Sequence, residues 1–171
     1  MRDYREELGL VRRLQTKPPV DIAGIARVMG LKVWEDHDLP EGIAGKILKD
    51  SKNGGSRGHS IVVRAQDPYS RKRFTVAHEL AHYILHRNQF IGDSLSDDAL
   101  YRSGLSSRVE AQANGLAAEL LMPWHLLLPF VGKKSNQEIA DLFGVSGEAM
   151  RIRLESKSYT SPQLQTLGVS R

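Results

Sequence analysis

The segment 76–86, which reads VAHELAHYILH, constrains the fold of this chain more than any other. Its apolar residues recur at the spacing of a helix that buries one side. Upstream, Asp67 is followed by Pro68, a pair typical of a helix start because aspartate can cap the first turn and proline suits its first position. The pattern predicts one long helix over 67–86, against which the rest of the chain must pack.

Within this helix, His78, Glu79 and His82 form the pattern H-E-x-x-H. Histidines four residues apart project from adjacent turns of one face, about 6 Å apart along the axis, so both imidazoles can reach one zinc ion. Glu79 points about 100° away, toward the polar side, where its carboxylate can act as general base on a water molecule. The pattern predicts a zinc hydrolase; the alternative is two ordinary histidines beside a solvated glutamate.

A catalytic zinc site needs a third protein ligand and an open fourth position. His86 is excluded as that ligand, because histidines at i, i+4 and i+8 spread about 12 Å along a helix; it can at most contact a ligand. In the helix expected over 107–121, Glu110 faces the same side as Asn114. Glu110 can bind the metal, or it can close the helix start as part of a Ser107-x-x-Glu110 capping box. The spacing leaves both interpretations open.

Asn114 also has two interpretations. One turn beyond Glu110, it can hydrogen-bond the outer nitrogen of a ligand histidine and fix its tautomer. It can equally be an ordinary surface asparagine.

Composition limits the chemistry and the location of the chain. There are no cysteines, so thiolate ligands and a thiol nucleophile are excluded, and histidine and carboxylates are the remaining strong metal ligands. The charged N-terminus lacks the apolar region of a secretory signal, and the most apolar stretch, 116–132, is interrupted by prolines and polar residues. We expect a cytoplasmic protein without membrane association.

The rest of the pattern predicts a single α+β domain over 1–171, with helices at both ends of the chain around a small sheet. Residues 1–19 form an N-terminal helical extension, and a second helix is expected over 20–29. Three strands are expected, which we interpret as an antiparallel meander, at 31–37, 41–50 and 59–65. The polar segment 87–106 has the length of a lid that gates access.

The C-terminal region 133–157 resembles a helix-turn-helix, because Ala140, Gly144 and Ser146 have the offsets of its turn. The rival function is therefore a DNA-binding regulator with a structural or vestigial metal site. Gly144 is equally a helix C-cap and Ser146 equally an N-cap, and the basic residues of the chain are spread out. We do not expect direct nucleic-acid binding. A nuclease with an all-histidine metal site would need a histidine at position 88, and this residue is Asn88. We therefore do not expect a nuclease.

Four segments together resemble the ImmA/IrrE metallopeptidases, a compact zincin family: PVDIAGIARVMGLKV, RFTVAHELAHYILH, VEAQANGLAAELLMP and IADLFGVSGEAMRIRL. The resemblance implies a zincin-like minimal metallopeptidase, in which a three-stranded sheet packs with the H-E-x-x-H helix, a helix that carries the third ligand, and C-terminal helices. It implies zinc as cofactor, His78, His82 and Glu110 as its ligands, and Glu79 as catalytic base. The chain departs from the family at Ala81, where glycine is common.

The resemblance also implies a protein substrate, a helix-turn-helix repressor of the Xre kind. The chain would cut such a repressor in response to a signal, or would pair with it as a toxin–antitoxin couple; both roles stay open. Independently, the small size of the chain leaves little room for deep pockets, so we expect a substrate segment to pair with an edge strand, either 41–49 or 59–65. The basic region 151–157 could hold an acidic face of the repressor.

Overall fold

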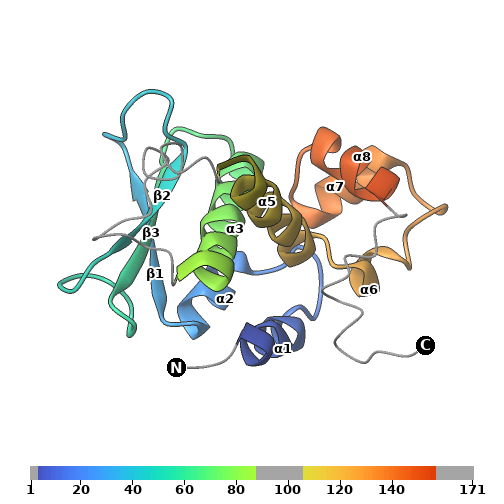
Figure 1. Ribbon diagram of the computed structural model, residues 1–171. Coiled ribbons are helices and arrows are strands. Elements are labelled where there is room, and N and C mark those ends of the chain that lie inside the picture. Colours follow the sequence, from blue (N-terminus) through green and yellow to red (C-terminus); the bar gives the residue numbers. More distant parts are fainter. Residues whose placement is uncertain (1–3, 88–105, 157–171) are drawn as a thin grey trace.

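A three-stranded sheet lies against the long helix α3 (Tyr69–His86) in the computed structural model, which describes residues 4–87 and 106–156 (Figure 1). The strands are β1 (Leu31–Asp36), β2 (Gly45–Lys49) and β3 (His59–Arg64), and their order in the sheet is β1-β3-β2. β2 pairs antiparallel with β3, whereas β1 pairs parallel with it. The expected antiparallel meander is therefore wrong: the sheet is mixed.

The burial of the strands explains their order. β3 takes the centre, with Ser60, Ile61 and Val63 buried, and no charged residue interrupts its interior. The outer strands each carry an exposed lysine, Lys32 in β1 and Lys46 in β2, a residue that protects sheet edges from unwanted pairing. The alternative of 59–65 as an edge strand is thus wrong, and β2 is the edge that contacts α3.

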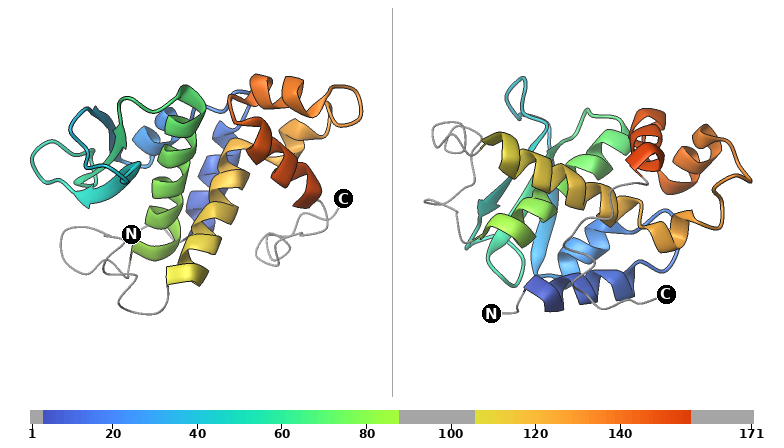
Figure 2. Two further views of the ribbon diagram at one scale, coloured as in Figure 1. Left: turned by 90° about the horizontal axis from the view of Figure 1, so that it is seen from above. Right: turned by 45° about the vertical axis from the view of Figure 1, so that its right-hand side comes forward.

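The helices predicted from the periodicity are present. The structure bounds them at α1 (Tyr4–Leu14), α2 (Ile22–Val28), α5 (Ser106–Leu121), α7 (Asn136–Phe143) and α8 (Gly147–Glu155). The chain also forms a short helix, α6 (Trp124–Leu127). Figure 2 shows α3 between the sheet and α5, with α7 and α8 beyond α5. On α5, Ala113 and Ala117 are fully buried, and their small side chains allow close packing against α3. None of the described helices is long and apolar enough to cross a membrane.

The helix ends agree with the sequence in two places and differ in one. Gly144 is the left-handed C-cap of α7 with φ of 64°, and Ser146 caps α8 by accepting a hydrogen bond from the Ala149 N–H. At α3, however, the cap residue is Pro68, and the expected capping by Asp67 is wrong. The Asp67 carboxylate instead forms an ion pair with Arg71 on the first turn, at 3.4 Å.

Candidate metal centre

Three side chains from α3 and α5 converge at one point between the two helices. Nε2 of His78 lies 3.0 Å from Nε2 of His82. The Glu110 carboxylate reaches both rings, with Oε2 3.2 Å from His78 and Oε1 3.1 Å from His82. The structure therefore places the Glu110 carboxylate at the histidines, the arrangement expected of a ligand and not of a capping box.

The three donors fit a metal ion in spacing and in charge state. Ligand atoms around a tetrahedral zinc ion lie about 3.3 Å apart, given Zn–N distances of 2.0–2.1 Å, close to the spacing of these atoms. Oε1 of Glu110 is buried and accepts no hydrogen bond in the described part of the chain. A buried carboxylate oxygen without a donor is costly, and a cation at this point would remove the cost.

His82 is neutral at physiological pH. Burial, and to a smaller extent the neighbouring rings of His78 and His86, lower its pKa to about 3. A protonated histidine therefore does not explain the approach of the Glu110 carboxylate to His82. The neutral ring offers a lone pair, which is the form that binds metals.

The outer nitrogen of His78 contacts Asn114. Its Nδ1 lies 2.9 Å from Oδ1 of Asn114, and an amide oxygen only accepts hydrogen bonds. Nδ1 of His78 must then carry the proton, which leaves Nε2 bare and facing the cluster. Of the two interpretations of Asn114, the structure favours the one in which it fixes the tautomer of a ligand.

His86 lies at the other side of His82. It is 3% exposed, and its Nδ1 is 3.2 Å from Nδ1 of His82. Its Nε2 is 3.2 Å from Oε1 of Gln112 on α5. The sequence had placed His86 near a ligand at most, which agrees with this position, but it gave no reason to select Gln112, because glutamine is an ordinary residue on a helix.

Glu79 is buried, with 9% of its surface exposed, so the solvated glutamate of the alternative interpretation is wrong. The reason is that α3 is covered on several sides, by the sheet, α2 and α5. Glu79 adjoins His78 in the sequence and remains the acidic residue of the H-E-x-x-H pattern.

The edge strand β2 meets α3 one turn before His78. A Cβ atom at Gly45 would lie 2.4 Å from Cγ2 of Thr75 and 2.8 Å from the Val62 carbonyl oxygen, so only glycine allows this approach. Phe74 stacks against the His78 ring, with 6.3 Å between ring centroids. The start of β2 is therefore held against α3 one helical turn before His78.

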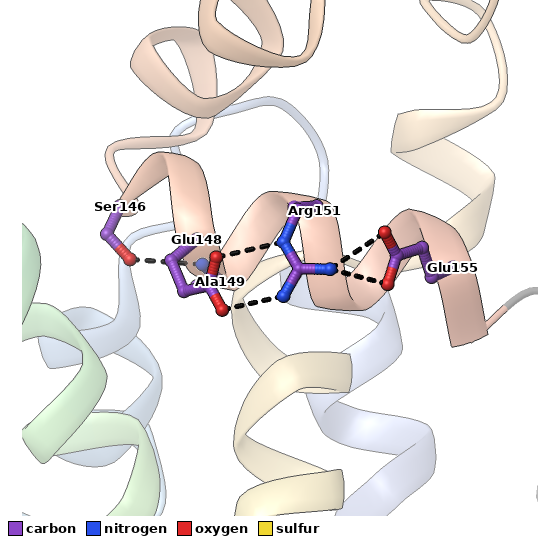
Figure 3. A network of polar contacts seen from close by, with 5 residues as sticks. All are labelled: Ser146, Glu148, Ala149, Arg151 and Glu155. Carbon is purple, nitrogen blue, oxygen red and sulfur yellow. Dashed lines mark hydrogen bonds and ion pairs between the residues drawn. The ribbon is translucent and has the colours of Figure 1, made fainter.

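The basic C-terminal region does not form a positive surface in the described residues. Figure 3 shows Arg151 on α8 between Glu148 and Glu155, with hydrogen bonds of 2.7–2.9 Å to both carboxylates. Arg153 is 6% exposed; it donates to the Met122 carbonyl at 3.0 Å and pairs with Glu119 at 2.7 Å. The expectation of a basic partner-binding region over 151–157 is therefore wrong for both arginines.

Two expectations lie outside the described residues. Lys157, the last member of that basic region, is one of them. The proposed lid over 87–106 is the other, apart from its two end residues.

Residues 36–155 match the profile of a family described as the IrrE N-terminal-like domain, Peptidase M78. The radiation response metalloprotease IrrE of Deinococcus deserti is 31% identical over 131 residues, which cover 71% of this chain and 42% of that protein. IrrE of Deinococcus radiodurans is 31% identical over 135 residues, covering 73% of this chain and 37% of that protein. The chain thus spans about two fifths of the length of these curated relatives.

Among solved structures, a Mycobacterium tuberculosis transcriptional regulator has a similar fold, with a TM-score of 0.59 and 14% identity; the match covers 92% of this chain and 48% of the other. The family profile, by contrast, matches well over half of the chain and includes all three converging residues. The two IrrE proteins that this chain resembles are metalloproteases. The chain belongs to the peptidase family M78, the family of the IrrE N-terminal-like domain.

Proposed function

We propose that this chain is a zincin-like, zinc-dependent endopeptidase in which His78, His82 and Glu110 hold the metal. The observation that carries the proposal is the convergence of both Nε2 atoms with the Glu110 carboxylate, whose buried Oε1 accepts no hydrogen bond in the described residues. Zinc is favoured because neutral imidazoles and a carboxylate are its usual catalytic ligands, and the chain has no thiolate to compete. When bound, zinc supplies Lewis acidity for the scissile carbonyl and for the attacking water.

Glu79 is the proposed general base. Its carboxylate takes a proton from the attacking water and can return it to the leaving amine as the peptide bond breaks. The buried position keeps this proton from exchanging freely with solvent. Glu79 follows His78 directly in α3, so the base and a ligand are held by the same rigid helix.

The edge of β2 that faces away from β3, which no described strand covers, is the proposed site for an extended substrate segment. The Arg64 N–H donates to the Ala44 carbonyl at 2.9 Å, and the Asp50 N–H donates to the Gly58 carbonyl at 2.7 Å. Hydrogen-bonded pairs alternate along an antiparallel ladder, so the even-numbered residues of β2 bond to β3. Gly45 and Ile47 then direct their backbone groups to the open edge, where a peptide can add as a further strand.

The proposed substrate is a helix-turn-helix repressor of the Xre kind, either cut in response to a signal or paired with this chain as an antitoxin. The family resemblance supports this substrate. Backbone pairing at the edge strand gives affinity with little side-chain selection, so a narrow choice of substrate comes from docking of the repressor on a separate surface in addition to this pairing. The test incubates the chain with repressors encoded beside its gene and with casein, each with and without a chelator. Cleavage of one repressor that the chelator stops is expected; rapid, chelator-sensitive digestion of casein would contradict narrow specificity.

The alternative function, a DNA-binding regulator with a structural or vestigial metal site, is supported by the turn between α7 and α8. The pairing of Arg151 with two glutamates opposes it, because the exposed face of α8 presents two carboxylates for one guanidinium and would repel phosphates (Figure 3). A gel-shift titration with duplex DNA at low salt separates the functions. The proposal expects no complex in the micromolar range, and a salt-sensitive complex would favour the regulator.

A further inference from the structure

A chain of hydrogen-bond partners runs from α5 through His86 to His82. Oε1 of Gln112 lies 3.2 Å from Nε2 of His86, and Nδ1 of His86 lies 3.2 Å from Nδ1 of His82. His86 and His82 are almost fully buried, at 3% and 2% exposed. Buried polar groups need partners, so these contacts fix where the ring protons sit.

The order of the protons follows from the chemistry of the end group. An amide oxygen can only accept, so Nε2 of His86 must donate to Gln112. A neutral ring carries one proton, which leaves Nδ1 of His86 as an acceptor. Nδ1 of His82 then donates to it, and Nε2 of His82 is left with its lone pair facing His78 and Glu110.

We propose that Gln112 and His86 are positioning residues that hold His82 in the tautomer that presents Nε2 to the metal. This inference rests on the proposed function, since it assigns a purpose to the arrangement only if His82 is a ligand. Neither residue touches the substrate or the metal. Their effect passes through the orientation and basicity of His82, as in other metal sites where the outer nitrogen of a ligand histidine is hydrogen-bonded.

The helix α5 therefore serves both histidines. Asn114 sets the tautomer of His78 directly, and Gln112 sets that of His82 through His86. Glu110, the proposed third ligand, lies on the same helix between the histidine rings. Packing of α5 against α3 thus places Glu110 and the amides of Gln112 and Asn114 beside the histidines of α3.

The test compares Gln112→Leu, which removes the acceptor at similar size, with Gln112→Glu, which retains an oxygen acceptor. Zinc affinity of the full chain is measured by competition with a chromophoric chelator. Gln112→Leu is expected to lose about 10- to 100-fold in zinc affinity, the usual cost of removing such a contact. Gln112→Glu should stay within about threefold of wild type on the same argument.

The second readout is the tautomer of His86 in the zinc-loaded chain, measured by long-range proton–nitrogen NMR correlations. We expect the Nε2–H form in wild type and in Gln112→Glu, and loss of this form in Gln112→Leu. A wild-type affinity in Gln112→Leu, an equal loss in both variants, or an Nδ1–H form of His86 in wild type would each overturn the inference while leaving the zinc site intact. Absence of zinc binding by wild type would instead overturn the proposed function beneath it.

Discussion

Oε1 of Glu110 lies 3.1 Å from Nε2 of His82, and in the described part of the chain this buried oxygen receives no hydrogen bond. Burial, with the neighbouring rings of His78 and His86, keeps His82 neutral by lowering its pKa to about 3. Two lone-pair atoms therefore face each other away from bulk water, an arrangement that is unfavourable unless a cation lies between them.

Glu110→Gln is expected to lower zinc affinity by about an order of magnitude or more, because a neutral amide oxygen replaces the only anionic ligand proposed for the site. Chelator competition measures the change. Glu148→Gln is the matched control, since it makes the same chemical change on the exposed face of α8 and should leave zinc affinity unaltered. Undiminished zinc binding in Glu110→Gln would place the third ligand elsewhere.

Glu79→Gln is expected to keep the fold and the metal but to abolish proteolysis, because the side chain keeps its size and loses only its ability to take a proton. Circular dichroism and zinc content verify that the variant is intact. Cleavage of the partner repressor is then followed by gel electrophoresis. A variant that cleaves at the wild-type rate contradicts the role of Glu79.

The stability of the metal-free chain should fall as the pH drops from about 6.5 toward 3. The pKa of His82 is about 3 in the folded chain and 6.5 in a model peptide, so the unfolded chain binds this proton first. Protons bound preferentially by the unfolded state lower the free energy of unfolding. Urea denaturation at pH 7 and pH 5 is compared between wild type and His82→Gln, which cannot titrate. Equal pH dependence in the two proteins would refute the burial argument.

Gly45→Ala is expected to destabilise the chain by about 1–3 kcal/mol, because the added Cβ would overlap Cγ2 of Thr75 and the Val62 carbonyl oxygen. Gly115→Ala is the control. Gly115 is an exposed interior residue of α5 with no atom near the added Cβ, so this change should stabilise the chain by up to about 1 kcal/mol. Both values come from urea denaturation. Equal stability of the two variants would mean that β2 and α3 are not in close contact.

The elements that the sequence predicted well are those set by local patterns. Helical periodicity located α3 and α5, and the spacing of His78 and His82 within one helix placed the two rings together without knowledge of the fold. Glu110 was harder, because Ser107-x-x-Glu110 also fits a capping box. Only the packing of α5 against α3 brings its carboxylate to the histidines.

Features that depend on long-range packing were missed. Alternating strand patterns indicate which residues face the core but not the order of strands, so β3 was not recognised as the centre of a mixed sheet. Gln112 carries no sequence signal, since its role comes from the position of His86 on another helix. The ion pairs on the exposed face of α8 are different. Glu148 and Glu155 lie three and four residues from Arg151, a spacing that predicts these pairs from the sequence.

The central claim is that His78, His82 and Glu110 hold zinc. The metal content of the chain purified without added metal tests this claim most directly. Mass spectrometry measures the zinc content of dialysed wild type and of His82→Asn at equal protein concentration. Dividing the zinc concentration by the protein concentration gives the zinc per chain. A ratio near one for wild type and near zero for His82→Asn is predicted. Wild-type protein that retains no zinc, or a variant that retains as much as wild type, would contradict it.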